Sequence, residues 1–334
     1  DKNDIIVLKG TEKINLTKHR ITNMTTKLSG ETILITGGAG SLGSSLTKLL
    51  AKDNKVIIYS RSEERQHQMK QDFFGKEQQN NLQFVIGDLR NTDILAKHLQ
   101  NSTIAIHAAA MKDLIMCEEQ VRKACLDNID GSHSFLQACK ASHSLKVICG
   151  VSTDKAASPS SVYGCTKYIQ EQLFREASRF LNAKICSVRF GNMIDSRGSL
   201  VPEWKKHPES IRGITHPEVS RFFFTLEDAA KTVMHALTHS QNGDLYIRKM
   251  KKAKIIDIMR VITGKTDFPV IGLFPGEKVH EDLLSITETP FCHVEGDYYV
   301  VRSEHAASTP CDVFSTESAE GFSKEELSEI ISRL

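Results

Sequence analysis

Long hydrophobic runs are absent from this sequence. No apolar segment reaches the ~18 residues that a membrane-spanning helix needs, and no signal peptide is visible at the start of the chain. Charge of one sign is also lacking, since 43 Lys and Arg residues are balanced by 41 Asp and Glu residues, for a formal net charge of +2. This balance implies neither nucleic acid nor a membrane as a partner.

Cysteine and histidine patterns typical of disulfide frameworks and metal sites are missing as well. The eight cysteines contain no CxxC pair, and several lie in apolar segments, where a thiol behaves as a small hydrophobe. The thirteen histidines show no HExxH or similar ligand spacing. We therefore predict no metal site and a reducing, cytoplasmic location.

A glycine-rich turn follows the first buried-strand pattern of the chain, at residues 32–36, and precedes a helical pattern over 41–52. Its glycines are spaced GxxGxxG. This spacing allows a tight turn, close backbone approach to a pyrophosphate, and amides at a helix N-terminus. Together with its flanking elements, the turn predicts a dinucleotide cofactor. The residues predicted to bind it here are Gly37, Gly40, Ser41, Leu42 and Gly43.

The next predicted strand, residues 55–59, ends in Ser60 and Arg61. Sites selective for NAD commonly carry an acidic residue here, which binds the ribose hydroxyls. A hydroxyl and a guanidinium instead suit a 2′-phosphate, because Arg offers bidentate donors. The pair favours NADP, and the alternative is a solvated Arg at the start of a helix over 63–73.

Two further strand ends complete the predicted cofactor site. Asp88 and Leu89 follow a strand over 82–87, where the carboxylate could meet the adenine amine; alternatively Asp88 caps the helix that starts near Thr92. Ala108 and Ala109 follow the next strand, and their small side chains let the backbone lie against a flat cofactor.

Strands and helices alternate over residues 31–191, which predicts an α/β fold with a right-handed, doubly wound parallel sheet of the Rossmann type. Residues 192–334 begin loop-rich and are predicted to form mainly a smaller C-terminal substrate-binding lobe, from which some segments could return to the NADP-binding domain. The polar residues 1–30 could be a vector-derived remnant, with Met24 as a native start, or an arm that docks on a neighbouring subunit.

The segment from 151 to 167 concentrates reactive side chains. Thr153, Asp154 and Lys155 stand at the end of a strand, and Tyr163 and Lys167 follow on a predicted helix. Residues at i and i+4 share a helical face, so the ammonium can approach the phenol. A neighbouring cation would lower the pKa of the tyrosine from its usual ~10 towards useful proton transfer.

With GxxGxxG, Tyr163-x-x-x-Lys167 and Arg189-Phe190-Gly191-Asn192, residues 31 to about 300 resemble an extended short-chain dehydrogenase/reductase. Ser-Thr-Asp-Lys-Ala ahead of Tyr-Gly-x-Thr-Lys is more specific. It is similar to the soluble, C5-inverting UDP-N-acetylglucosamine 4,6-dehydratases of flagellin-glycan and capsule pathways. The chain departs from that group at Asp113, where His usually follows the lysine, and at Phe274, where Arg usually precedes Pro-Gly-Glu-Lys.

The resemblance implies transient oxidation of the sugar at C4 by NADP, elimination of water across C5 and C6, and reduction at C6. Tyr163, aided by Lys167 and Thr153, would be the base at C4. Lys155 would act at C5, and Asp154 would protonate the leaving hydroxyl. To act as a base, Lys155 must have a pKa well below ~10.4, and Lys167, NADP and partial desolvation are expected to lower it.

The resemblance also implies a UDP-sugar partner and a homo-oligomer, either a dimer or a hexamer. The residues at family positions that bind the UDP and the sugar are Lys112, Asn192, Arg197, Arg221 and Glu281. Three alternatives remain open: a UDP-sugar 4-epimerase, a UDP-glucose 4,6-dehydratase, and a non-catalytic NADP-binding regulator. The intact tyrosine–lysine pair argues against the last of these.

Overall fold

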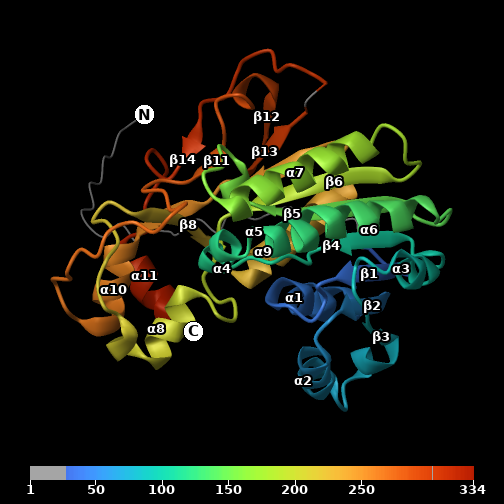
Figure 1. The fold of residues 1–334 in the computed structure, drawn as a ribbon, viewed down its shortest axis with the longest axis horizontal. Helices are drawn as coiled ribbons and strands as arrows, with labels where there is room; N and C mark the ends of the chain where they lie inside the picture. The colour runs from blue at the N-terminus through green and yellow to red at the C-terminus, as the bar shows by residue number, and fades with distance from the viewer. Residues whose placement is uncertain (1–27, 303) are drawn as a thin grey trace, which may run out of the picture.

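The computed structural model describes residues 28–302 and 304–334, and a nine-stranded sheet forms its centre (Figure 1). Seven neighbouring strands, from β9 to β3 in the spatial order, run parallel, while β13 pairs antiparallel with both β9 and β12. The predicted doubly wound Rossmann fold is therefore confirmed. In spatial order the strands are β12 (Cys292–Glu295), β13 (Tyr298–Val301), β9 (Leu245–Arg248), β6 (Lys184–Phe190), β5 (Val147–Thr153), β4 (Ile104–His107), β1 (Thr32–Thr36), β2 (Lys55–Ser60) and β3 (Leu82–Ile86).

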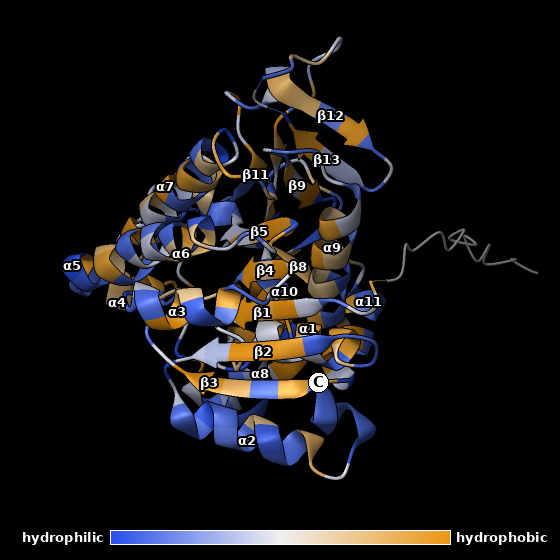
Figure 2. Ribbon diagram, turned by 90° about the vertical axis from the view of Figure 1, so that its right-hand side faces the viewer, coloured by the Kyte–Doolittle hydropathy of each residue, from blue (hydrophilic) through white to orange (hydrophobic). Residues whose placement is uncertain are grey.

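Helices cover both faces of this sheet (Figure 2). Side chains of a strand alternate between its two faces, so Ile33 and Ile35 of β1 join one core and Leu34 joins the other. The helices on the Ile33 face are α1 (Ser41–Leu50), α2 (Glu63–Phe73) and α9 (Leu226–His239). Those on the Leu34 face are α3 (Thr92–Leu99), α6 (Gly131–Lys140) and α7 (Val162–Ala177).

Between β4 and β5, the sequence predicts a single helix from about Cys117 to Ser142, and this prediction is wrong in detail. The structure has α4 (Leu114–Glu119), α5 (Val121–Cys125), a π-helical turn (Leu126–Asp130) and then α6. Gln120, at φ −124° and ψ 56°, interrupts the helix. In the π-helical turn, the buried Asn128 side chain binds the backbone of Met111 and the hydroxyl of Thr166, which ties the chain after β4 to α7.

A smaller lobe with its own core lies at the carboxyl edge of the sheet. It contains the sheet β10–β8–β7, and beside it β11 pairs with β14. These strands are β7 (Asn192–Met193), β8 (Ser220–Phe224), β10 (Lys251–Lys254), β11 (Asp282–Leu284) and β14 (Phe314–Ser315). Its helices are α8 (Leu200–Lys206), α10 (Ile255–Thr263) and α11 (Lys324–Ser332). The short helical turns of the fold are η1 (Glu77–Asn81), η3 (Asp154–Ala156), η4 (Pro208–Ser210) and η5 (Thr289–Phe291).

The chain crosses between the two parts several times. After residue 191 it builds part of the lobe and returns to the large sheet as β9, β12 and β13. The prediction of a vector-derived remnant or a docking arm concerns residues 1–30, and residues 1–27 lie outside the part of the chain that the structure describes. No helix in the described ranges is long and apolar enough to cross a membrane.

Candidate active site

A cavity of about 1260 Å³ opens at the carboxyl ends of the parallel strands, between the sheet and the smaller lobe. In sheets of this topology, ligands bind at this edge, where the strand order reverses. Every residue predicted to bind the cofactor lines the cavity. Of the predicted catalytic and substrate residues, all but Asp154 and Glu281 line it.

The glycine-rich turn is packed so closely that side chains would not fit. A Cβ on Gly37, where φ is +67°, would lie 2.8 Å from the backbone of Ala109, and one on Gly43 would lie 2.5 Å from Gly38. Gly40 is the N-cap of α1 and offers no side chain to its first amides. The turn therefore presents bare backbone to the cavity, as a pyrophosphate site requires.

The end of β2 carries Arg61, whose guanidinium donates to both oxygens of Asp127, at 3.0 and 3.2 Å. Lys123 donates to the same carboxylate at 2.8 Å. The Arg61 side chain is 53% exposed at the cavity wall. The Arg61 guanidinium is therefore not an unpaired, solvated group, because its ion pair with Asp127 holds it at the edge of the site.

Asp88 is also paired, with the guanidinium of Arg90. This contact keeps the pKa of the Asp88 carboxyl well below its usual range, against the effect of burial. The alternative that Asp88 caps the following helix is wrong, because Asn91 is the N-cap of α3 and accepts from the amide of Ile94.

The catalytic candidates at the end of β5 form a linked group. The Thr153 hydroxyl donates to Asp154 Oδ1 at 2.9 Å, and Lys155 Nζ donates to the same oxygen at 3.1 Å. Lys155 reaches the cavity, whereas Asp154 is fully buried behind it. The pair is turned inward, beside the residues predicted to hold the cofactor.

The expected fall in the pKa of Lys155 is not what the structure shows. Burial alone would lower it, but the carboxylates of Asp154 and Glu281 outweigh burial and the Arg221 charge, so the pKa is raised. The sequence reasoning placed only Asp154 beside this lysine. Glu281 comes from a distant part of the chain and adds the second negative charge.

Tyr163 and Lys167 lie where the helix α7 begins, after the N-cap Ser161. Burial, Asp154 and Cys117 raise the pKa of Tyr163, and a hydrogen bond with Thr153 opposes them only in part. Burial lowers the pKa of Lys167 to about 7. The expectation of a lowered tyrosine pKa is therefore wrong for this arrangement, because burial dominates and the lysine has other partners.

Those partners anchor the lysine to the sheet. Lys167 Nζ donates to the carbonyl of Val151 at 2.6 Å and to Gln170 Oε1 at 2.5 Å. Gln170 Nε2 donates to the same carbonyl at 3.0 Å. The sequence analysis overlooked Gln170, although its position one helical turn after Lys167 indicated a shared face.

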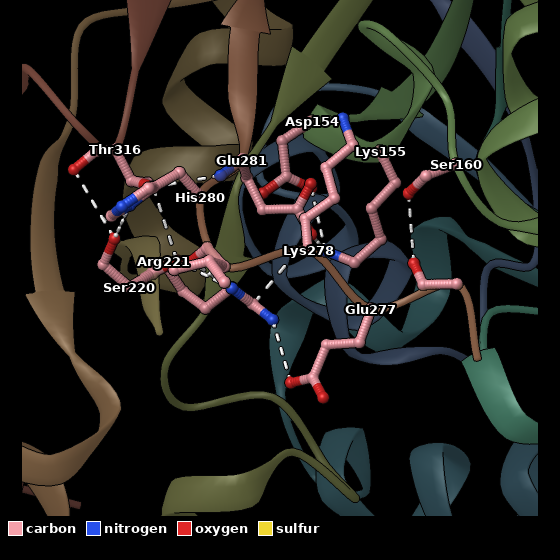
Figure 3. Close-up of polar contacts among 12 residues, drawn as sticks. Asp154, Lys155, Ser160, Ser220, Arg221, Glu277, Lys278, His280, Glu281 and Thr316 are labelled. Carbon is pink, nitrogen blue, oxygen red and sulfur yellow. Dashed lines mark hydrogen bonds and ion pairs between the residues drawn. The ribbon is translucent and has the colours of Figure 1, made fainter. Parts of the chain in front are cut away.

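Among the substrate candidates, Figure 3 shows Arg221 and Glu281, both from the smaller lobe. Arg221 of β8 donates to Glu277 Oε1 at 3.0 Å, a residue to which the sequence analysis assigned no role. Asn192 begins β7 and lines the cavity. Arg197 lies against the glycine-rich turn, because its guanidinium donates to the Ala39 carbonyl at 3.0 Å.

Lys112 lies on the side of the cavity near α2. Burial and the neighbouring Arg65 lower its pKa, and Asp113 opposes them. Glu281 does not line the cavity; its carboxylate lies 3.6 Å from Lys155 Nζ and 3.9 Å from Arg221 Nε.

Comparison with known proteins gives this arrangement a family. The family model described as polysaccharide biosynthesis protein matches residues 33–303. The chain belongs to this family. The matched range includes every predicted site residue.

Individual relatives are similar over most of their length. A UDP-N-acetylglucosamine 4,6-dehydratase (inverting) of Campylobacter jejuni is 33% identical over 282 residues, which are 82% of this chain and 83% of the relative. A UDP-glucose 4-epimerase of Rickettsia bellii is 31% identical over 285 residues, 80% of this chain and 82% of the relative. The X-ray structure of Pen from Bacillus thuringiensis is 30% identical, with a TM-score of 0.84, and the match covers 91% of this chain and 98% of Pen. The sequence resemblance is thus confirmed.

Proposed function

We propose that this polysaccharide biosynthesis protein is an NADP-dependent UDP-N-acetylglucosamine 4,6-dehydratase that inverts C5. The observation that carries the proposal is the Lys155 amine at the cavity wall, with Asp154 behind it and Tyr163 and Lys167 on the same wall. The inverting dehydratase relative from Campylobacter supports the same reaction. The activity would be that of a hydro-lyase.

The cavity fits a dinucleotide, because the glycine-rich turn leaves room only for backbone against its phosphates. Arg61 supports NADP, since a guanidinium offers paired donors to a 2′-phosphate. When bound, the nicotinamide would supply a reversible two-electron acceptor for C4 and C6. The residues that would hold the cofactor are Gly37, Gly40, Ser41, Leu42, Gly43, Ser60, Arg61, Asp88, Leu89, Ala108, Ala109, Tyr163 and Lys167.

The proton transfers fall to the side chains of this chain. Tyr163, hydrogen-bonded to Thr153, takes the proton of the C4 hydroxyl. The ketone at C4 makes the proton on C5 acidic, and Lys155 removes it. The proton that Tyr163 takes would pass through the Thr153 hydroxyl to Asp154, and Asp154 would then protonate the hydroxyl that leaves C6 as water. Lys155 then returns a proton to C5 on the opposite face, which inverts that centre.

The substrate would lie along the lobe side of the cavity. Arg221 and Arg197 offer guanidinium donors to the diphosphate, and Asn192 offers an amide to the sugar. Lys112 lies further towards α2 and would meet a phosphate from that side. Glu281 lies behind Lys155 and does not line the cavity.

The experiment that tests the proposal is NMR of the product from UDP-N-acetylglucosamine in heavy water. We expect a 4-keto-6-deoxy sugar with deuterium at C5, inverted configuration there and no net consumption of NADP. Absence of a 4-keto product with any UDP-hexose would reject the proposal. The epimerase relative from Rickettsia motivates a second candidate, a UDP-sugar 4-epimerase, whose product would keep its C6 hydroxyl. A 4-keto product from UDP-glucose alone would indicate the third, a UDP-glucose 4,6-dehydratase.

The choice of NADP has its own test. Arg61→Ala should raise the Kd for NADP roughly tenfold, because one charge-assisted pair to the 2′-phosphate is lost. The Kd for NAD, which has no 2′-phosphate, is the internal control and should stay the same. Equal changes in both constants, measured by fluorescence titration, would contradict a 2′-phosphate role for Arg61.

We also propose residues 31–191 as the NADP-binding domain, residues 192–334 as mainly substrate-binding, a cytoplasmic location, and assembly into a homo-oligomer. Apolar side chains exposed on neighbouring helices support assembly, since Ile115 of α4 is 51% exposed and Ile169 of α7 is 39% exposed. Light scattering during size-exclusion chromatography would report the mass of a dimer or a hexamer.

A further inference from the structure

Lys155 is flanked by two carboxylates, and the second comes from the smaller lobe (Figure 3). Its ammonium lies 3.1 Å from Asp154 Oδ1 and 3.6 Å from Glu281 Oε1. Both acids are buried, at 0% and 3% exposure. Asp154 Oδ2 and Glu281 Oε2 are buried without a hydrogen-bond partner among the described residues. Buried carboxylate oxygens without a hydrogen-bond partner are rare. Their position beside Lys155 indicates a functional role for this lysine.

The backbone fixes Glu281 in this place. Its amide donates to the Thr316 hydroxyl at 3.0 Å, and the Thr316 amide donates back to the Glu281 carbonyl at 2.8 Å. Asp282, the next residue, pairs with Ser315 between β11 and β14. Glu281, which directly precedes β11, therefore reaches Lys155 from behind the cavity wall, and the strand that follows it is paired with β14.

Other charged groups around Lys155 raise or lower its pKa and that of Glu281. Arg221 of β8 faces both Lys155 and Glu281, and its charge lowers the pKa of the lysine. Lys278 faces Glu281, which it helps to ionise. From α7, Tyr163 faces Asp154. Burial and Asp154 raise the pKa of Glu281, whereas Lys155 and Arg221 lower it. Asp154 and Glu281 therefore share the positive charge of Lys155.

We propose that Glu281 is a positioning residue for the reaction at C5, which holds the Lys155 ammonium and, with Asp154, sets its charge. Its consequence for catalysis depends on the proposed dehydratase function. When Lys155 takes the proton from C5, the amine becomes an ammonium, and the Glu281 carboxylate stabilises that charged product of the transfer. The ammonium exchanges its proton with solvent before it returns one to C5, so the step is balanced with water alone and deuterium enters C5 in heavy water.

Glu281→Gln removes this charge with little change of shape. The matched control is Glu277→Gln, because Glu277 contacts Arg221 from the same segment but does not contact Lys155 in the described structure. A third variant, Glu281→Asp, keeps the charge and moves it back by one methylene. Circular dichroism would establish that each variant is folded.

The first measurement needs no activity. Labelling with acetic anhydride at a series of pH values, followed by peptide mass spectrometry, gives the midpoint at which Lys155 becomes a free amine. We expect this midpoint to fall in Glu281→Gln, because a carboxylate that favours the ammonium has been removed. It should stay in place in Glu277→Gln and fall less in Glu281→Asp. An unchanged midpoint in Glu281→Gln overturns the proposal; if that variant does not fold, an unchanged midpoint in Glu281→Asp does so.

The second measurement is the pH profile of dehydration with UDP-N-acetylglucosamine. In Glu281→Gln the rising limb should move to lower pH, and kcat should fall roughly tenfold while KM stays within about twofold. A raised KM with an unmoved limb would make Glu281 a substrate-binding residue only and would also overturn the proposal. If the wild-type protein forms no 4-keto product but the labelling midpoint moves, the dehydratase function fails and the control of Lys155 by Glu281 stands.

Discussion

The reactive side chains of this protein are buried groups whose charges are set by their neighbours. Lys167 and Lys155 illustrate this. Both lie in the same wall, yet burial lowers the pKa of Lys167 to about 7, whereas two carboxylates keep the pKa of Lys155 raised. Their spacing in the chain identified both residues as candidates. The direction of each pKa depended on Glu281 and on burial, which local sequence patterns do not report.

Replacement of the phenol tests its role as a base. Tyr163→Phe should lower kcat by about 10²- to 10⁴-fold, because a positioned acid–base group is lost while the ring still fills its place. The matched control is Tyr168→Phe on the same helix, since Tyr168 is 43% exposed and does not line the cavity. Initial rates of 4-keto product formation give the comparison. Equal rates in the two variants would exclude Tyr163 as the base.

Whole elements were predicted well where the periodicity was local. The helix α2 has the bounds expected from the sequence, 63–73. The predictions of secondary structure failed where tertiary contacts determine the conformation of the backbone. The helix expected from about residue 117 to 142 is interrupted at Gln120, and it widens to a π-helical turn where Asn128 binds the backbone of Met111. Strands β8 and β10 of the lobe were overlooked, since their apolar and basic runs acquire strand character only by pairing with each other.

The glycine-rich turn permits a prediction for one element. Gly43→Ala places a Cβ 2.5 Å from Gly38, so the turn must shift away from Ala109 and from the cofactor. We expect a loss of stability of about 1–3 kcal/mol and a weaker affinity for NADP. Ser44→Ala, one position further along α1, is the control and should change neither. Urea denaturation and fluorescence titration measure the two effects; unchanged NADP affinity in Gly43→Ala would contradict this role for the turn.

At the scale of the molecule, one buried arginine connects the sheet to the smaller lobe. Arg189 of β6 is fully buried and donates to Glu171 of α7 and to Glu288 near η5. It also donates to the carbonyl of Leu283 in β11, two residues beyond Glu281. The strand that carries Glu281 to Lys155 is therefore tied to the core of the large domain. The motif Arg-Phe-Gly-Asn marked this strand end, but no sequence pattern indicated its distant partners.

Arg189→Met should destabilise the fold by about 3–5 kcal/mol at neutral pH, because it leaves the buried Glu171 carboxylate and the partly buried Glu288 carboxylate without their cation. The size of this destabilisation should depend on pH. Burial raises the pKa of Glu288, but Arg189 outweighs it and holds the pKa below the ordinary 4.5. The ion pair thus stabilises the native state above about pH 4.5 and ceases to do so as acid protonates the carboxyl. The difference between variant and wild type should therefore shrink towards acidic pH.

The control for this prediction is Arg179→Met, whose arginine pairs with Glu304 at 3.4 Å with both side chains more than half exposed. Such a surface pair contributes about 1 kcal/mol or less. Urea denaturation of wild type and both variants at pH 7 and near pH 3 gives the six free energies needed, because Glu288 stays ionised until the pH falls below about 4.5. A loss in Arg189→Met no larger than in the control, or one that does not change with pH, would mean that the buried pairs do not hold the lobe to the sheet. In that case the position of Glu281 beside Lys155 would have to depend on the β11–β14 pairing and Thr316 alone.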